Sequence, residues 1–144
     1  MIKVEIFRLE HLDSFQTETQ FEDLGRDMAR NLLDINKSML SMIKDEKTIA
    51  ILGVSTLRPG AGELWLMPSI HVNNYKFEFF KITKKLIYGY VFPHLEFHRL
   101  EIAILKDWAK GNKWAKKLGF DFSHICDHYD KLGRDHIIYK KVVM

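Results

Sequence analysis

A short connector, IHVNNYK (70–76), has the position and composition of a loop that could hold a phosphate group. It follows an apolar run that ends at Pro68 and precedes a helix that we expect to begin near Tyr75. The first turn of a helix presents free backbone N–H groups and the positive end of its dipole, and Lys76 would add a charge. The connector contains no glycine, so two alternatives stay open: a ligand-binding loop built from other residues, or a loop that binds nothing.

Histidine and cysteine spacing raises a second chemical possibility, a metal site. His124, Cys126 and His128 alternate along one expected strand, so they would share a face of the sheet and could supply three zinc ligands. Isolated groups of this kind are more often residues at the edge of a core. His94 and His98 are four residues apart, but a helix is expected to end between them, so helical spacing does not apply. We therefore expect no metal site.

The hydrophobic pattern predicts the elements that would position these groups. Alternating apolar residues indicate strands, and apolar residues at helical spacing indicate helices. Their order, β-α-α-β-β-β-α-β-α-β-β, combines a hairpin-rich front half with a βαβ crossover, which predicts an α/β fold with a mixed sheet. The expected strands cover 2–8, 37–44, 49–57, 63–67, 98–105, 120–129 and 135–143, and the expected helices cover 12–33 (one or two helices), 75–90 and 107–119.

Length and composition predict one compact domain over residues 1–144. No apolar run approaches the roughly 18 residues that span a bilayer, and no signal pattern precedes the first strand. The one cysteine, Cys126, cannot form an internal disulfide, so we expect a cytoplasmic location. The first half of the chain is net acidic and the second half net basic, which suits ligands of both charges. The net charge of +3 is too small to indicate nucleic acid as a partner.

Local sequences resemble those of the GNAT acyltransferase fold. LWLMPS (64–69) resembles its central strand, and WAKKLGFDF (114–122) resembles the short helix and LGF corner that lead into its last hairpin. The resemblance covers nearly the whole chain, residues 2–143. In two features, the lack of glycine and the Trp108/Trp114 helix, the sequence is most similar to GNAT-like proteins of bacteriophages. Among these is a small internal virion protein of podoviruses. Such an origin would imply the host cytoplasm or the virion as the location.

The resemblance implies an acetyl-CoA-dependent N-acetyltransferase without a metal. The loop in that family has the form x-x-Arg-Gly-x-Gly-x-Gly/Ala, and its backbone amides hold the pyrophosphate. Aligned from Pro68, His71 falls at the arginine position. Val72, Asn74 and Lys76 fall at the three small positions. If the loop holds pyrophosphate, we expect Asn73 or Asn74 to take the left-handed turn that glycine usually takes, whereas valine resists that conformation. The implied cofactor contacts are Leu66, Met67, Pro68, His71, Val72, Asn73, Asn74, Tyr75, Lys76 and Trp114.

Acylation of an amine needs a base for the ammonium proton and an acid for the leaving thiolate. The resemblance places the acid on a tyrosine four residues before the glycine of LGF, where this sequence has Ala115. Tyr129 or Tyr139, on the closing hairpin, could substitute, and we choose Tyr129. Glu63, at the start of the central strand, is the candidate base. Transfer would be direct, and Cys126 is not expected to act as a nucleophile.

A second interpretation is a catalytically degenerate GNAT-fold protein with a structural or interaction role, such as a phage virion or host-takeover component. The missing glycines and the missing tyrosine favour it, whereas the charge asymmetry favours the enzyme. For the enzyme, the expected partner is an amine on a small molecule or a protein, with no membrane and no nucleic acid. The sequence leaves the acceptor open, and it leaves open whether the chain forms a homodimer.

Overall fold

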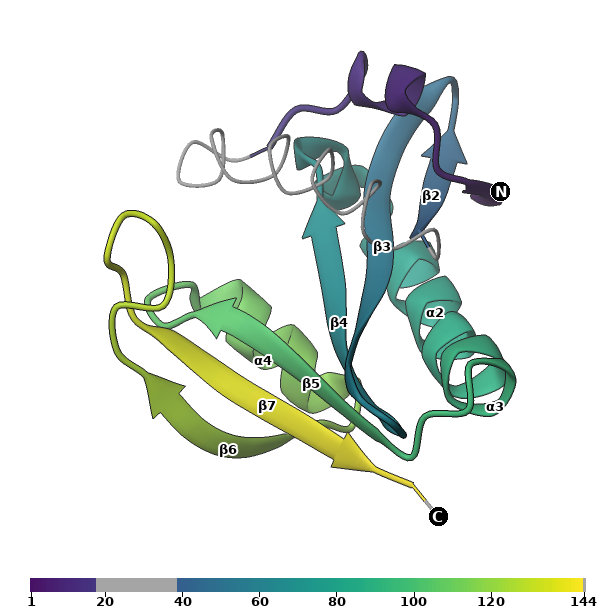
Figure 1. The fold of residues 1–144 in the computed structure, drawn as a ribbon. Helices are drawn as coiled ribbons and strands as arrows, with labels where there is room; N and C mark the ends of the chain where they lie inside the picture. The colour runs from purple at the N-terminus through teal and green to yellow at the C-terminus, as the bar shows by residue number, and fades with distance from the viewer. Residues whose placement is uncertain (18–38, 144) are drawn as a thin grey trace. The chain divides into compact units, whose positions relative to one another are not determined.

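The computed structural model describes residues 1–17 and 39–143, and it contains a mixed sheet (Figure 1). Its strands are hydrogen-bonded in the order β1-β2-β3-β4-β5-β7-β6. The seven strands expected from the sequence are present, which confirms the α/β fold class. The strands are β1 (Lys3–Ile6), β2 (Met39–Lys44), β3 (Lys47–Arg58), β4 (Ala61–Pro68), β5 (Arg99–Leu105), β6 (Asp121–Cys126) and β7 (His136–Val142).

Helical segments connect these strands at the expected places. The predicted helix over 75–90 is observed as α2 followed by a π-helical turn, and the predicted helix over 107–119 is observed as α4. Most of the helical region expected over 12–33 lies outside the described residues. No described helix is both long enough and apolar enough to cross a membrane. The segments are η1 (Leu9–Leu12), η3 (Ile70–Asn74), α2 (Lys76–Leu86), η4 (Ile87–Val91), α3 (Phe92–His94) and α4 (Ala109–Lys117).

The parallel pair that the βαβ pattern predicted is β4 and β5. Their register runs from Ala61↔Arg99 to Glu63↔Glu101, and β5 then pairs antiparallel with β7. The closing hairpin is also confirmed, because β6 pairs antiparallel with β7. Glu63 therefore occupies the last of these parallel pairs, directly opposite another carboxylate.

The described chain divides into two compact units. The first comprises Met1–Ser55 and Trp65–Ile87, and the second comprises Thr56–Leu64 and Tyr88–Met144. The single domain expected over the whole chain stays a prediction.

The first unit has a core around β3, whose residues from Thr48 to Val54 are buried. A strand buried on both faces is a continuous apolar run, as β3 is here. Helix α2 buries Phe79 and Thr83, and the Thr83 hydroxyl lies 3.9 Å from the sulfur of Met42, which places α2 against β2. A further cluster joins buried Phe7, Leu12, Phe15, Met39 and Ile51 with the half-buried Trp65 and Met67.

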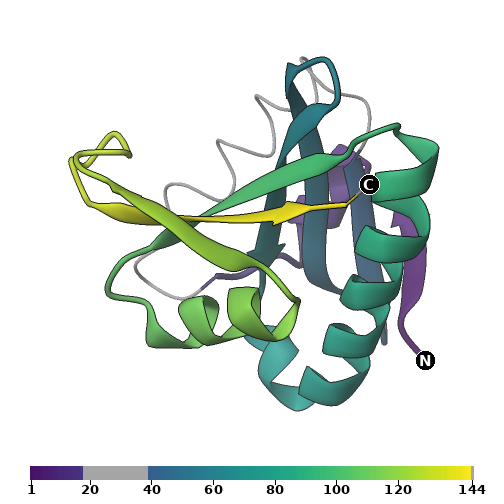
Figure 2. The same ribbon diagram turned by 90° about the horizontal axis from the view of Figure 1, so that it is seen from below.

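The second unit packs α4 against strands β5 and β6 (Figures 1 and 2). The LGF corner ends this helix because Gly119 has a φ of 91°, a conformation that L side chains rarely adopt. Its N–H donates to Lys116 O at 3.0 Å, and Phe120 N donates to Ala115 O at 3.1 Å. These two bonds form a Schellman motif, which turns the chain from α4 into β6.

Candidate functional site

The connector after β4 forms the 3-10 helix η3, and its first amides are already used inside the protein. Ser69 N donates to Ile49 O at 2.8 Å, and Ile70 N donates to Gln16 O at 2.7 Å. The Ser69 side chain caps the helix, because its Oγ accepts the N–H of His71 at 3.2 Å. These amides have acceptors in the protein, so a phosphate could bind them only by displacing those bonds.

The left-handed turn expected at Asn73 or Asn74 is wrong. Both residues belong to η3, and the non-glycine residues with positive φ in the described part of the chain lie elsewhere. Val72 is not strained either, because its φ is not positive, and its side chain is 1% exposed and packs in the core. The valine that looked like a defect in a glycine loop is therefore an ordinary packing residue. In the described part of the chain, the non-glycine residues with positive φ are Asp45, Glu46, Glu96 and His128.

One turn later, at the start of α2, helix geometry predicts amides that have no acceptor within the helix. The N–H of Phe79 bonds to Tyr75 O at 2.9 Å, which closes the first turn of the helix. The N–H groups of Lys76, Phe77 and Glu78 precede that bond, so helix geometry gives them no acceptor within α2. Lys76 and Phe77 are exposed beside them. Sequence reasoning missed Phe77 and Glu78, although first-turn position alone would have indicated them.

Charged side chains near the start of α2 are paired with one another. Glu78 accepts from Lys44 Nζ at 2.7 Å through Oε1 and from the N–H of Ile2 at 2.6 Å through Oε2. The Lys44 and Ile2 hydrogen bonds lower the pKa of Glu78. The Tyr75 hydroxyl donates to Asp45 at 2.9 Å, which raises the pKa of Tyr75. Tyr75, a predicted cofactor contact, is thus bonded to the β2–β3 turn.

The Glu78 contacts predict a pH-dependent contribution to stability. Because folding lowers the pKa of Glu78, its contribution is fully present above the ordinary glutamate pKa and is lost as pH falls through the folded-state value. Glu78→Gln should therefore unfold at lower denaturant concentration than the wild type at neutral pH, and the two should converge in acid. Denaturant unfolding across the pH range measures this. Glu96→Gln, at an exposed site, is the control. A difference in unfolding midpoint between Glu78→Gln and the wild type that stays the same at all pH values would contradict the prediction.

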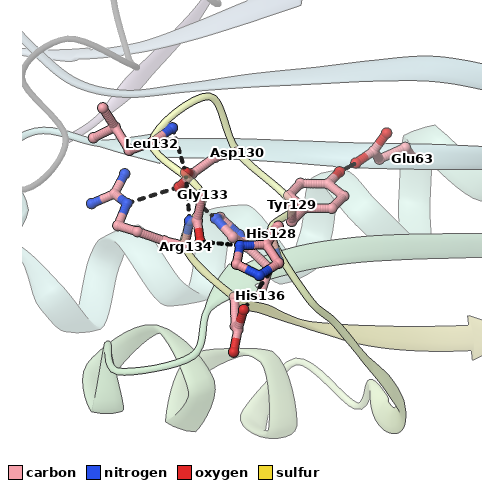
Figure 3. Close-up of polar contacts among 9 residues, drawn as sticks. Glu63, His128, Tyr129, Asp130, Leu132, Gly133, Arg134 and His136 are labelled. Carbon is pink, nitrogen blue, oxygen red and sulfur yellow. Dashed lines mark hydrogen bonds and ion pairs between the residues drawn. The ribbon is translucent and has the colours of Figure 1, made fainter.

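In the second unit, the two predicted catalytic residues contact each other. The Tyr129 hydroxyl donates to Glu63 Oε1 at 2.7 Å (Figure 3). Tyr129 is 43% exposed, and Glu63 is half-buried, so solvent-borne molecules can reach the pair. Two causes raise the pKa of Tyr129: partial burial, which is the larger one, and the hydrogen bond to Glu63. At neutral pH the phenol is therefore a hydrogen-bond donor to the carboxylate, and it is a weaker acid than a free tyrosine.

The alternative acid, Tyr139, is placed differently. It is 2% exposed, and its hydroxyl donates to Asn112 Oδ1 at 2.8 Å. Asn112 also donates to the carbonyls of Leu105 and Trp108, so this group ties α4 to the strands. Ala115, at the position where the resemblance expects a tyrosine, is 1% exposed and offers no hydroxyl. Of the two substitute tyrosines, only Tyr129 is exposed to solvent, and its hydroxyl bonds to the candidate base Glu63.

The remaining predicted cofactor residues lie in both units. In the first unit, Met67 packs against the hydrophobic cluster, and Leu66 and Pro68 are half-buried near the end of β4. In the second unit, Trp114 makes an edge contact with Trp108 at a ring separation of 5.7 Å, and Lys110 Nζ lies 5.5 Å from the Trp114 ring centre. Their roles in cofactor binding stay predictions.

The histidines and the cysteine considered for zinc make other contacts. His124 Nδ1 lies 3.0 Å from Ser123 Oγ, and His128 Nδ1 lies 3.0 Å from Gly133 O. Cys126 is half-buried with a free thiol. Within residues 1–17 and 39–143, no group of three or more histidine, cysteine, aspartate or glutamate side chains could hold a metal ion.

A Ser–His–Glu order also occurs in the first unit. Ser41 Oγ lies 2.8 Å from His11 Nδ1, and His11 Nε2 lies 3.6 Å from Glu5. The serine is 0% exposed, and the same His11 nitrogen accepts the N–H of Arg8 at 3.1 Å. A substrate cannot reach a hydroxyl buried in this way, so the cluster anchors η1 against β2.

The loop between β6 and β7 holds groups that sequence reasoning missed. Asp130 Oδ1 accepts the N–H groups of Leu132 and Arg134 at 2.9 and 3.0 Å. Its Oδ2 accepts from Arg134 Nε at 2.8 Å and lies 3.0 Å from His136 Nε2 (Figure 3). Burial raises the pKa of Asp130, but the bonds from His136 and Arg134 outweigh it and hold the pKa well below its usual range. The i,i+4 spacing of Asp130 and Arg134 was the available signal.

Comparison with known proteins places the fold. No family model and no curated protein matches the sequence. A GNAT-family acetyltransferase from Bacillus anthracis matches at a TM-score of 0.75 and 10% identity, covering 98% of this chain and 94% of that chain. The ribosomal-protein-S5-alanine acetyltransferase from Vibrio fischeri matches at 0.69 and 15%, covering 98% and 92%. A chimera of the spermidine N-acetyltransferase from Vibrio cholerae matches at 0.70 and 11%, covering 98% and 95%.

At such low identity these likenesses show a shared fold and nothing finer. The GNAT fold expected from the sequence is confirmed, with its mixed sheet of seven strands. The narrower resemblance to phage-encoded proteins finds no support among the comparisons.

Proposed function

We propose that this chain, which has the GNAT acetyltransferase fold, transfers the acetyl group of acetyl-CoA directly to an amine. The observation that carries the proposal is the Tyr129–Glu63 hydrogen bond at 2.7 Å, on a pair that solvent reaches. Glu63 takes a proton from the acceptor ammonium, and the neutral amine then attacks the thioester carbonyl. The new C–N bond forms as the C–S bond breaks, the acylated nitrogen releases its excess proton to solvent, and the thiolate of CoA leaves.

Tyr129 serves this reaction as a hydrogen-bond donor to the base. A carboxylate has several acceptor positions, so Glu63 can hold the Tyr129 hydroxyl and still accept a proton from an amine. The raised pKa of Tyr129 makes proton donation to a thiolate less favourable, which argues against the role of acid expected from the sequence. The thiolate of CoA then leaves without a tyrosine acid and takes its proton from solvent.

The proposed cofactor contacts centre on the start of α2. The first-turn amides, the positive end of the helix dipole and the exposed Lys76 together favour an anionic pyrophosphate. The amides of η3 contribute less than a glycine loop would, because they are bonded to Ile49, Gln16 and Ser69. We therefore expect this chain to bind acetyl-CoA more weakly than an enzyme with a glycine loop does.

A second candidate is a GNAT-fold protein that has lost catalysis and serves as a structural or interaction component. Two observations favour it: the occupied amides of η3 and the buried Ala115 in place of a tyrosine. The two functions differ in one property that can be measured directly, the binding of acetyl-CoA.

Thermal unfolding with and without acetyl-CoA tests the proposal. At about 100 times its dissociation constant, the ligand should stabilise the fold by roughly 2.7 kcal/mol. Lys76→Glu should reduce the stabilisation, because it places a negative charge beside the phosphates. Lys81→Glu, on an exposed site further along α2, is the matched control and should bind like the wild type. No stabilisation at millimolar acetyl-CoA would favour the non-catalytic protein.

Release of CoA thiol in the presence of candidate amines tests the chemistry. Spermidine and a peptide with an N-terminal alanine represent a small-molecule amine and a protein amine. These are the acceptors that the names of two structural neighbours suggest.

A further inference from the structure

The β6–β7 loop, residues 127–135, is organised around one carboxylate. Asp130 closes the loop by accepting two backbone N–H groups, from Leu132 and Arg134. The Gly133 N–H in turn donates to Asp130 O at 2.8 Å. Tyr129 precedes this carboxylate in the chain, and its own N–H donates to Arg134 O at 3.0 Å. The backbone that carries Tyr129 is therefore fixed by bonds across the loop.

The Tyr129 ring has a separate support, the imidazole of His136. The two ring centres are 4.7 Å apart with an interplanar angle of 43°. On its other side, the imidazole is held by Asp130, whose Oδ2 lies 3.0 Å from Nε2. Because the carboxylate is ionised and can only accept, the Nε2 atom carries the proton in this pair. His136 thus joins the loop carboxylate to the tyrosine ring.

The other nitrogen of this imidazole shows that packing alone does not account for His136. Its Nδ1 is buried and has no hydrogen-bond partner among the residues that the structure describes. A buried polar atom without a partner is unfavourable, and a phenylalanine would pack against Tyr129 without that penalty. What the imidazole adds over a phenyl ring is the bond to Asp130.

We propose that His136 is a positioning residue that keeps the Tyr129 hydroxyl on Glu63. Asp130 holds the imidazole, the imidazole holds the tyrosine ring, and the ring directs its hydroxyl to Glu63 Oε1 (Figure 3). The contact between His136 and Tyr129 is ring against ring, so no proton passes along this path. The inference rests on the proposed function for its catalytic consequence, although the positioning itself does not depend on it.

Positioning matters here because Tyr129 is half-exposed. Water competes for its hydroxyl, and an unsupported side chain on a loop would sample other rotamers. Whenever the Tyr129 hydroxyl moved away from Glu63, the carboxylate would lose its hydrogen-bond donor. The expected loss is that of one hydrogen bond to a charged group, about tenfold or slightly more.

The kinetic test uses the full chain with acetyl-CoA and the better of the two probe amines. His136→Ala should lower kcat about tenfold, as Tyr129→Phe should, with the KM for acetyl-CoA nearly unchanged. If His136 acts through Tyr129, adding His136→Ala to Tyr129→Phe should cause no further loss. Additive losses in the double variant would overturn the proposal.

Two further variants separate positioning from general loosening of the loop. His128→Asn removes another side-chain bond of the same loop, to Gly133 O, at a site where asparagine tolerates the positive φ. It should leave kcat within about twofold, since a single exposed hydrogen bond contributes little. His136→Phe keeps an aromatic ring and removes the bond to Asp130. It should fold and still lose activity, and wild-type kcat in this variant would overturn the role of Asp130.

A spectroscopic test does not need activity. The ring carbons of Tyr129, assigned by comparison with Tyr129→Phe, report its titration by NMR. Partial burial and the bond to Glu63 both raise the pKa of Tyr129. Loss of that bond should therefore lower the pKa of Tyr129 in His136→Ala, as it should in Glu63→Ala, which leaves no acceptor at this position. An unchanged Tyr129 titration in His136→Ala would overturn the positioning role. If the wild type transfers no acetyl group, the proposed function fails, and this titration alone decides the inference.

Discussion

Replacing Glu63 with glutamine should lower turnover by roughly 10²-fold or more and leave the affinity for acetyl-CoA almost unchanged. Glutamine keeps the shape of the side chain and can still accept the Tyr129 hydroxyl through its carbonyl oxygen, but it cannot take a proton at neutral pH. The substitution therefore removes the base while it preserves the geometry. Initial rates of CoA release measure turnover, and calorimetry measures the affinity.

The neighbouring strand supplies a matched control for this substitution. Glu101 pairs with Glu63 in the parallel register, but its carboxylate accepts from Arg99 Nε at 3.2 Å. Glu101→Gln changes the same charge at nearly the same place without removing the proposed base. It should reduce turnover far less than Glu63→Gln. Equal losses would indicate a general effect of negative charge, and an unchanged rate in Glu63→Gln would move the base to water or to the substrate.

The fold could be predicted from the sequence because its signals are local. Alternating or continuous apolar runs indicated the strands, and the order of strands and helices indicated the βαβ crossover that makes β4 and β5 parallel. The glycine of the LGF corner marked the end of α4, where Gly119 has positive φ. Each of these features depends on residues within a few positions of each other, so a linear pattern contains them.

The candidate site was predicted only in part, because its contacts are not local. Glu63 and Tyr129 could each be named from residue type and position, but 66 positions separate them in the chain. Their hydrogen bond depends on how the β6–β7 loop is folded. That loop is shaped by Asp130, which sequence reasoning did not consider, and by His136, whose ring contact has no sequence pattern.

The connector after β4 was misread for a related reason. An alignment to a glycine loop gives each position the conformation of that loop, and it predicted a left-handed turn. The observed 3-10 helix is instead set by partners far away in sequence, since Ser69 bonds to Ile49 and Ile70 bonds to Gln16. These tertiary bonds, together with the burial of Val72, override what the aligned positions suggested.

The second large effect that we expect is a loss of stability when a residue of the connector after β4 is replaced. Val72→Gly should destabilise the fold by about 2–4 kcal/mol, which combines the loss of a fully buried valine side chain with the backbone entropy of glycine. In a glycine-type loop the same change would relieve strain and tighten acetyl-CoA binding. Here it removes a side chain that is 1% exposed from a segment without positive φ, so nothing is relieved.

Asn74→Gly is the matched control within the same connector. Asn74 is exposed, so glycine there removes no buried surface and should cost at most about 1 kcal/mol. Denaturant unfolding of the wild type and both variants measures the free energies, and the shift in midpoint should be several times larger for Val72→Gly. A stabilised Val72→Gly variant that also binds acetyl-CoA more tightly would mean that the connector adopts the glycine-loop conformation when the cosubstrate is bound. A destabilised variant with unchanged intrinsic affinity would mean that the pyrophosphate depends on the first turn of α2, where Lys76 and the first-turn amides lie.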